Sequence, residues 1–250
     1  MRKPLMAGNW KMYKTPAETA AFFEKFLPLV AASNHADILI CPPYVNIAAA
    51  VAAARGSNVE VGGQNLHTAN KEGAYTGEIT GAMLRAAGCS AAIVGHSERR
   101  QYFGETCATV LQRTLAALDA GLRPVVCVGE RLEERESGRT EEVLAAQFRD
   151  GIAKLTPEQF GWIAIAYEPV WAIGTGKTAT PDMAADAHRY LRSLVRQAYG
   201  AEAAAGVRIL YGGSVKPDNV RGLMAQPEID GALVGGASLD PVSFASIVNF

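Results

Sequence analysis

The sequence predicts an α/β protein built as one closed barrel of eight parallel strands, each followed by a helix. Short, nearly continuous apolar runs alternate with longer amphipathic runs, as expected for strands that are buried on both faces. Dividing 250 residues among eight strand–helix pairs gives about 31 residues for each, the size of a βα unit. Many strand-like runs also end in a glycine or polar cluster, and in a parallel barrel these ends meet on one face.

The expected strands are short apolar runs that stop at turn signals. They are Leu5–Gly8, Asp37–Cys41, Val59–Gly62, Ala91–Val94, Arg123–Val128, Trp162–Tyr167, Val207–Tyr211 and Gly231–Val234. On the pattern alone, an open doubly wound sheet remains an alternative, although eight units fit a closed barrel better.

Capping patterns place helices between these strands. Thr15 to Leu29 begins with a Thr-Pro-Ala-Glu capping pattern, and Thr140 to Leu155 begins with acidic residues at the positive end of the helix dipole. The other expected helices are Ala48–Ala54, Glu105–Ala120 before Gly121, Pro181–Tyr199 before Gly200, and a last helix opened by Asp240-Pro241. Since no linker rich in Pro, Ser or charge divides the chain, we expect residues 1–250 to form a single (β/α)8 barrel domain.

The composition excludes several classes of protein. Lys plus Arg is 24 and Asp plus Glu is 25, which gives a formal net charge of −1. This balance argues against a nucleic-acid partner held by a basic face. Hydrophobic residues make up 49% of the chain, too many for a disordered protein.

Cysteine usage and hydropathy indicate the compartment. Cys41, Cys89, Cys107 and Cys127 are widely spaced and form no CxxC pair, so we expect reduced thiols and no metal site. The longest weakly polar run, Tyr44–Ala54, is too short to span a bilayer, and the first residues show no secretory pattern. The expectation is a soluble, cytoplasmic protein with no membrane partner.

Chemically useful side chains follow several expected strands. Asn9 and Lys11 follow the first, His96 and Glu98 the fourth, and Glu168 the sixth. Taken singly, each has an ordinary structural explanation; Lys11 alone would be a surface lysine. Together, a carboxylate, an imidazole and an ammonium around one cavity suit proton transfer next to a carbonyl group.

Glycine-rich turns follow the last two expected strands, at Gly212-Gly213-Ser214 and at Gly235-Gly236. Backbone N–H groups can approach an anion closely where no Cβ intervenes, although such pairs could also be simple tight turns. In barrels the turns after strands 7 and 8 often hold a phosphate group.

The segment Pro169–Lys177 is interpreted as a mobile lid. It has proline at one end, glycines near the other, and large apolar residues between them: Val170, Trp171 and Ile173. Such a flap could fold over a site and exclude water.

Two nucleotide-binding patterns overlap this lid. Gly176-Lys177-Thr178 resembles the end of a phosphate-binding loop, but the required upstream glycine is replaced by Trp171. Gly174–Ala179 matches GxGxxA, yet it is separated from its strand and lacks the following acidic residue. A nucleotide-dependent barrel enzyme therefore remains only an alternative hypothesis.

Several long motifs in order resemble the triosephosphate isomerase family over essentially the whole chain. The segments are Gly8–Lys11, Gln64-Asn65 with Gly73–Glu78, Val94–Arg100, Ala166–Lys177, Tyr211–Val215 and Val234–Leu239. The sequence departs from the family at no position that the family uses in catalysis.

This resemblance implies a TIM barrel that interconverts D-glyceraldehyde 3-phosphate and dihydroxyacetone phosphate through an enediol(ate), in glycolysis and gluconeogenesis, without a metal or organic cofactor. It implies Glu168 as the base, His96 as the electrophile that polarises the carbonyl, Lys11 as the group that stabilises negative charge, and Asn9 as an orienting residue. A catalytically silent barrel scaffold is the other alternative, but it has no need of all four residues.

The resemblance also assigns supporting residues. Substrate and phosphate would be held by Asn9, Lys11, Gly174, Ser214, Gly235 and Gly236. The lid would comprise Pro169, Val170, Trp171, Ala172, Ile173, Gly174, Thr175, Gly176 and Lys177. Residues behind the site would be Ser97, Glu98, Cys127 and Tyr211, with Glu98 either relaying a proton or pairing with Lys11.

The segment from Gln64 to Ile79 is long for a connection between a strand and a helix. It could be a floppy loop. The resemblance instead implies an arm that inserts into a second subunit and brings Thr76 near the partner's site. We therefore expect a homodimer through residues 64–79.

Overall fold

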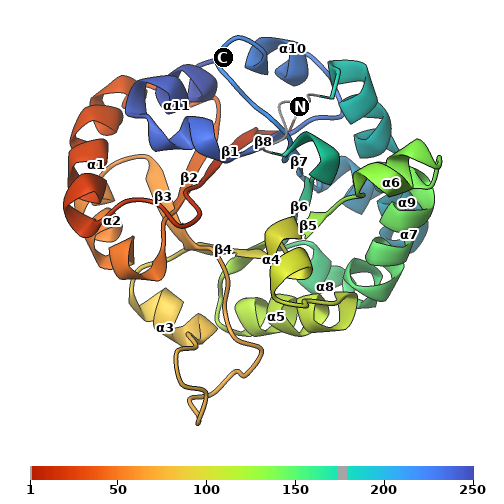
Figure 1. The fold of residues 1–250 in the computed structure, drawn as a ribbon, viewed down its shortest axis with the longest axis horizontal. Helices are drawn as coiled ribbons and strands as arrows, with labels where there is room; N and C mark the ends of the chain where they lie inside the picture. The colour runs from red at the N-terminus through yellow and green to blue at the C-terminus, as the bar shows by residue number, and fades with distance from the viewer. Residues whose placement is uncertain (1, 174–178) are drawn as a thin grey trace.

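The structure, a computed structural model, describes residues 2–173 and 179–250. In these residues, parallel strands β1 to β8 pair in sequence order and close into a barrel (Figure 1). The strands are β1 Leu5–Asn9, β2 Asp37–Cys41, β3 Val59–Gly63, β4 Ala91–Val94, β5 Arg123–Val128, β6 Ala164–Tyr167, β7 Ile209–Tyr211 and β8 Gly231–Val234. Because β1 pairs with β8, Leu5 opposite Gly231, the predicted barrel is confirmed and the open sheet is excluded.

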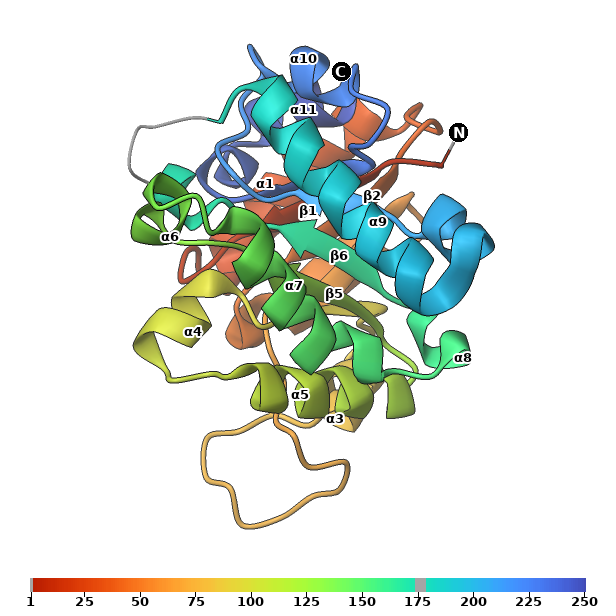
Figure 2. The same cartoon turned by 90° about the vertical axis from the view of Figure 1, so that its right-hand side faces the viewer.

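Helices surround the barrel on its outer side (Figures 1 and 2). The α-helices are α1 Pro16–Val30, α2 Ile47–Ala54, α3 Gly81–Ala86, α4 Ser97–Tyr102, α5 Cys107–Asp119, α6 Leu132–Glu136, α7 Thr140–Asp150, α8 Pro157–Phe160, α9 Pro181–Gly206, α10 Val220–Met224 and α11 Pro241–Val248. Short 3₁₀ helices are η1 Tyr44–Asn46, η2 Ile152–Lys154, η3 Val170–Ala172 and η4 Gly236–Leu239. Across the described ranges, we find no helix with the length and apolar character needed to traverse a bilayer.

Local chemistry explains where α1 and α5 begin and end. Thr15 and Glu18 form the reciprocal capping box that the sequence predicts for α1. The α5 helix begins at Cys107, later than predicted, because Thr106 caps it and the preceding Glu105 turns inward. Its C-terminal end is set by Gly121, whose φ of 71° is a left-handed conformation that glycine adopts readily.

Other boundaries differ from the prediction. The β6 strand begins at Ala164 rather than at Trp162, which is 66% exposed and lies in the turn after α8. The β7 strand begins two residues later than predicted, at Ile209. The predicted helix 140–155 is divided at Gly151 into α7 and η2, whereas α9 continues past its predicted end through a kink at Gly200, where φ is 87°.

The alternation of side chains along each strand positions the site. Leu5 and Ala7 of β1 fill the barrel interior, and the same alternation turns Asn9 toward the barrel mouth. In β6, Ala164 and Ala166 fill the interior. Since every second residue points to the same side, Glu168 also faces inward. The interior cluster contains Leu5, Ala7, Leu39, Cys41, Ala91, Ile93, Val125, Cys127, Ala164, Ala166, Leu210 and Leu233.

A histidine is buried between the barrel and its longest described helix. His188 of α9 is fully buried, its ring packs edge-on against Tyr167, and Nδ1 lies 3.2 Å from the carbonyl oxygen of Glu228. Burial lowers the pKa of His188 to about 3, because the charged ring would lose its hydration. The native state therefore holds this ring neutral.

This burial predicts acid sensitivity of the fold. In the unfolded chain His188 binds a proton below pH ~6.5, whereas the folded protein does not bind it until about pH 3. Unfolding thus takes up a proton in that window, so the free energy of unfolding falls as pH decreases, by up to ~1.4 kcal/mol per pH unit. Urea titrations of the native chain and of His188→Asn should show a shallower pH slope for the variant; equal slopes would contradict the prediction.

Candidate active site

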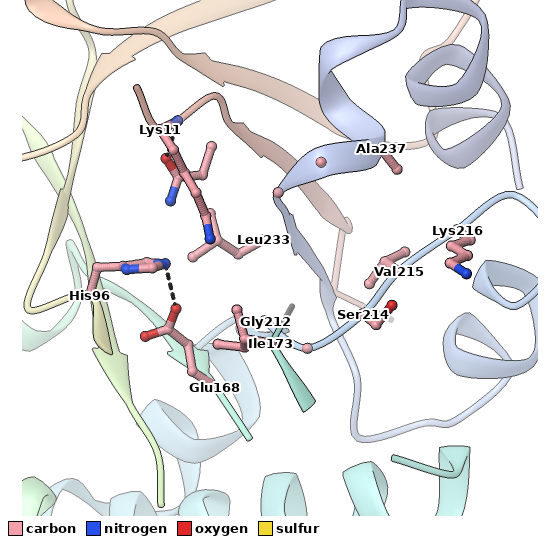
Figure 3. A pocket seen from close by; sticks show the side chains of 14 residues that line it. Lys11, His96, Glu168, Ile173, Gly212, Ser214, Val215, Lys216, Leu233 and Ala237 are labelled. Atoms are coloured by element: carbon pink, nitrogen blue, oxygen red, sulfur yellow. Dashed lines mark hydrogen bonds and ion pairs between the residues drawn. The ribbon is translucent and has the colours of Figure 1, made fainter. Parts of the chain in front are cut away.

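A cavity of about 270 Å³ opens at the carboxyl ends of the barrel strands (Figure 3). We call it the central cavity. Its lining residues are Asn9, Lys11, His96, Glu168, Ile173, Gly212, Gly213, Ser214, Val215, Lys216, Leu233, Gly235, Gly236 and Ala237. The predicted catalytic and phosphate-binding residues within the described ranges therefore meet in one place, although they come from distant parts of the sequence.

Glu168 and His96 point toward each other on one wall of this cavity (Figure 3). The Glu168 side chain is almost completely buried, and its Oε1 lies 2.8 Å from Nε2 of His96. The backbone N–H of Ser97 donates to Oε2 of the same carboxylate over 2.9 Å. Both oxygens are therefore held on the wall of the cavity.

His96 is the N-cap residue of α4, and this fixes its ring. The backbone N–H of Glu98 donates to Nδ1 of His96 over 3.2 Å, which requires a lone pair on Nδ1. The ring proton is consequently placed on Nε2, the nitrogen that faces Glu168 and the cavity. Neutral imidazole in this tautomer is a hydrogen-bond donor toward the centre of the site.

The two groups shift each other's protonation. Burial raises the pKa of Glu168, but His96, the Ser97 N–H and Lys11 outweigh it and hold that pKa below its ordinary value. Burial lowers the pKa of His96, while the Glu168 carboxylate opposes this and raises it overall. Glu168 is thus an ionised carboxylate at neutral pH, ready to accept a proton.

Removing the carboxylate charge should change the titration of His96. In Glu168→Gln the pKa of His96 is expected to fall, because burial then acts without the neighbouring negative charge. The chemical shifts of the ring followed by NMR against pH measure this directly. A pKa that stays constant or rises in the variant would disprove the assigned coupling.

Lys11 is held in an unusual backbone conformation. Its φ of 52° lies in the left-handed region, and the side-chain amide of Gln64 donates to its carbonyl oxygen over 2.8 Å. Nζ of Lys11 is 2.5 Å from Oε1 of Glu98, and Oδ1 of Asn9 accepts from the Lys11 N–H. These contacts position the ammonium group at the edge of the central cavity, and they show Glu98 as the ion-pair partner of Lys11.

The opposite side of the cavity is formed by the two glycine-rich turns. Ser214, Gly235 and Gly236 line it, and their backbone N–H groups donate to no acceptor within the described part of the chain. The hydroxyl and N–H of Ser238 both donate to the Gly235 carbonyl, which holds this turn in place. Unpaired N–H groups on a concave surface are suited to bind an oxyanion.

Close packing around Glu168 requires glycine at two positions. A Cβ on Gly212 would lie 2.9 Å from Cγ of Glu168, and a Cβ on Gly129 would lie 1.7 Å from the Glu168 carbonyl oxygen. Both distances are shorter than normal contacts, so a side chain at either position would displace Glu168. The glycines after β5 and β7 therefore support the position of Glu168.

Glu130 is a buried residue that sequence reasoning did not single out. Its side chain accepts hydrogen bonds from Tyr167 Oη, at 3.1 Å, and from Trp171 Nε1, at 2.8 Å, and pairs with Arg135 at 3.2 Å. Its carbonyl oxygen also accepts from the Val170 N–H over 3.0 Å. Glu130 thus joins the start of the predicted lid to the end of β5. The sequence feature that could indicate this residue is its position directly after Gly129, where a strand ends.

The predicted lid is described only in its first part. Val170, Trp171 and Ala172 form η3, and Pro169 packs close to Gly213. Ile173 faces the central cavity together with Leu233, so apolar groups lie near Glu168. The predicted residues Gly174, Thr175, Gly176 and Lys177 lie outside the described residues.

The residues predicted behind the site take supporting positions. Cys127 is buried on β5, and burial raises the pKa of its thiol. Tyr211 is buried on β7, where burial raises its pKa to about 12, and its hydroxyl occupies the space next to Gly213. Thr76 is exposed. It belongs to the arm 64–79, which projects away from the barrel (Figure 2).

The closed parallel barrel, with this cavity at the carboxyl ends of its strands, defines a (β/α)8-barrel enzyme. The family model described as triosephosphate isomerase matches residues 4–250. A relative named triosephosphate isomerase from Solibacter usitatus (strain Ellin6076) is 70% identical over 250 residues, covering 100% of each chain. The chain belongs to the triosephosphate isomerase family.

Other comparisons agree. A triosephosphate isomerase from Moorella thermoacetica (strain ATCC 39073 / JCM 9320) is 56% identical over 250 residues, which covers 100% of this chain and 99% of that protein. The crystal structure of triosephosphate isomerase from Bartonella henselae is similar with a TM-score of 0.89 and 39% identity. That similarity covers 99% of this chain and 98% of the other.

Proposed function

We propose that Glu168, His96, Lys11 and Asn9 carry out the triosephosphate isomerase reaction in this chain, the interconversion of D-glyceraldehyde 3-phosphate and dihydroxyacetone phosphate. The observation that carries the proposal is the contact of 2.8 Å between a buried carboxylate and Nε2 of His96 on the wall of the central cavity. A base and a hydrogen-bond donor so placed can move a proton between the two carbons of an α-hydroxy carbonyl compound.

In the proposed reaction, the substrate enters between Glu168 and His96. Starting from the aldehyde, Glu168 removes the proton from C2, and the C–H electron pair forms the enediolate double bond as charge moves to the carbonyl oxygen. His96 gives its Nε2 proton to the oxygen on C1 and takes the hydroxyl proton from the oxygen on C2. Glu168 returns a proton to C1 as C2 becomes the carbonyl carbon, which gives the ketone. For this, the carboxylate must turn from the Ser97 N–H toward the substrate.

His96 and Lys11 stabilise the charge that develops. Nε2–H of neutral His96 donates to the substrate oxygen, since Nδ1 already accepts the Glu98 N–H. Once the substrate separates His96 from Glu168, burial favours the neutral ring. Lys11 supplies positive charge to the enediolate and the phosphate, and Asn9 orients the Lys11 backbone through its Oδ1.

The phosphate group is proposed to bind the free N–H groups of Ser214, Gly235 and Gly236. It takes no part in the proton transfer, but its binding energy can orient the substrate and drive lid closure. Closure over the apolar side chains of Ile173 and Leu233 would exclude water from the substrate side of Glu168, which raises the basicity of this carboxylate and protects the enediolate from loss of phosphate.

Conversion of D-glyceraldehyde 3-phosphate followed directly by NMR tests the activity, using purified protein with no added cofactor or coupling enzyme. Formation of dihydroxyacetone phosphate is the expected result. Dependence on an added nucleotide would favour the alternative based on residues 174–179, and absence of turnover would favour the silent scaffold. The family membership favours the isomerase over both.

We also propose that the protein is a homodimer through the arm 64–79. The arm projects from the barrel (Figures 1 and 2), and the His67 N–H donates to the Ile79 carbonyl at its base. A second cavity of about 300 Å³ adjoins the site and is lined in part by Met12, Tyr44 and Phe103. Exposed apolar side chains around a cavity are typical of a surface that a partner covers.

The dimer can be tested with a matched pair of arginine variants. Sedimentation at micromolar concentration should give twice the mass of 26.5 kDa for the native chain. Met12→Arg should shift it toward the monomer, because Met12 is 93% exposed beside the second cavity. Val242→Arg, at a 61% exposed position on α11, should leave the mass unchanged. A native chain that sediments as a monomer would refute the dimer.

We propose that residues 1–250 form one domain, which the continuous barrel from β1 to β8 supports. We propose a cytoplasmic location, which the free thiols of all four cysteines, each within the described ranges, support.

A further inference from the structure

Glu168 separates two cavities. On one side lies the central cavity; on the other lies a cavity of about 350 Å³, which we call the rear cavity. The rear cavity is lined by residues that include Ser97, Glu105, Cys107, Gln147 and Glu168. The lining residues Gln101, Thr106 and Arg131 are exposed, so the rear cavity reaches solvent at its outer end.

The inner end of the rear cavity contains a hydrogen bond that catalysis must break. Ser97 is buried, and its backbone N–H donates to Oε2 of Glu168 over 2.9 Å. When the carboxylate turns to the substrate, this N–H loses its acceptor. A buried N–H without a partner is unfavourable, so another acceptor must replace the carboxylate.

The rear cavity can supply a water molecule as this acceptor. It is far larger than a single water requires, and it offers polar partners besides Ser97. Oε2 of Glu105 is buried there and has no hydrogen-bond partner among the described residues. The side chain of Gln147, in contrast, is already bonded to both backbone groups of Gly129.

We propose that the rear cavity is a water port for the catalytic base. This proposal rests on the proposed isomerase function. When the carboxylate turns, a water that enters behind Glu168 accepts the hydrogen bond from the Ser97 N–H. The same water contacts the proton that Glu168 has removed from the substrate. Glu168 gives this proton to the water and receives another proton from solvent. The exchange changes neither the charge nor the number of atoms at Glu168, and in D2O it replaces hydrogen with deuterium.

The rear cavity can be plugged without a change of sequence. Cys107 is half-buried at the rim, whereas Cys41, Cys89 and Cys127 are buried, so a thiol reagent should modify Cys107 first. We would treat the enzyme with benzyl methanethiosulfonate and confirm a single addition by mass spectrometry. The matched control is Cys107→Ser treated in the same way, and methyl methanethiosulfonate provides a smaller plug.

The measurement is isotope partition in D2O. Glyceraldehyde 3-phosphate is converted with each enzyme, and NMR of the product gives the fraction of deuterium at C1, relative to hydrogen transferred from C2. We expect the benzyl plug to lower the deuterium fraction several-fold, the methyl plug to lower it less, and treated Cys107→Ser to match the untreated enzyme. An unchanged fraction in fully labelled enzyme would overturn the water port, whereas lack of turnover by untreated enzyme would overturn the isomerase function itself.

Discussion

Glu168→Gln is expected to lower kcat by about 10²–10⁴-fold, the range that general acid–base catalysis contributes. Glutamine keeps the shape of the side chain and retains an oxygen to accept the Ser97 N–H, which glutamate accepts over 2.9 Å. It cannot, however, hold a proton taken from carbon. Steady-state kinetics in both directions of the reaction measure the effect.

The control for this variant is Glu133→Gln, an exposed carboxylate in the first turn of α6. It should keep native turnover. Binding of a non-reactive phosphate-bearing analogue to Glu168→Gln, followed by calorimetry, should persist, since the glycine-rich turns are unchanged. Near-native kcat in Glu168→Gln would remove Glu168 from the role of base.

Lys11→Met should lower kcat/KM by about 10²–10³-fold, the usual effect of removing one group that stabilises developing charge. The ammonium lies at the edge of the central cavity and is held by Glu98 at 2.5 Å. Since Lys11 is proposed to contact both the phosphate and the enediolate, KM should rise and kcat should fall. Initial rates over a range of substrate concentrations separate the two.

Lys14→Met provides a matched control. Lys14 has the same unusual backbone conformation, with φ of 71°, but its ammonium lies over the rings of Trp10 and Phe22. Any strain caused by methionine in a left-handed conformation is therefore similar in both variants. Lys14→Met should keep native kcat/KM; a loss as large as that of Lys11→Met would assign the effect to the backbone.

The sequence allowed the fold and most of the site to be predicted, because both follow from local periodicity. Apolar runs that stop at glycine mark the strand ends, and parallel strands bring these ends together. Asn9 and Glu168 follow such runs directly, so their placement needs only the direction of a strand. Trp162 is apolar and is therefore expected in a strand, but its position in the turn after α8 leaves it exposed.

The residues that could not be predicted depend on contacts across the fold. Glu130 binds Tyr167 and Trp171, which lie 37 and 41 residues away along the chain. Gln64 fixes the Lys11 carbonyl from 53 residues away. Glu130 follows Gly129 after β5, and Gln64 follows Gly63 at the end of β3. These positions mark strand ends but do not reveal the partners, because the contacts form only once the barrel has closed.

The alternation of side chains in β6 has a consequence for how such a site can evolve. Ala164 and Ala166 fill the barrel, and Glu168 follows them with the same parity. A slip of one residue in the pairing of β6 with β5 would turn Glu168 out of the cavity and expose the interior alanines to the helices. Insertions and deletions can therefore be tolerated in the connections at the amino ends of the strands, away from the central cavity, but within the strands a single one would disrupt packing and catalysis together.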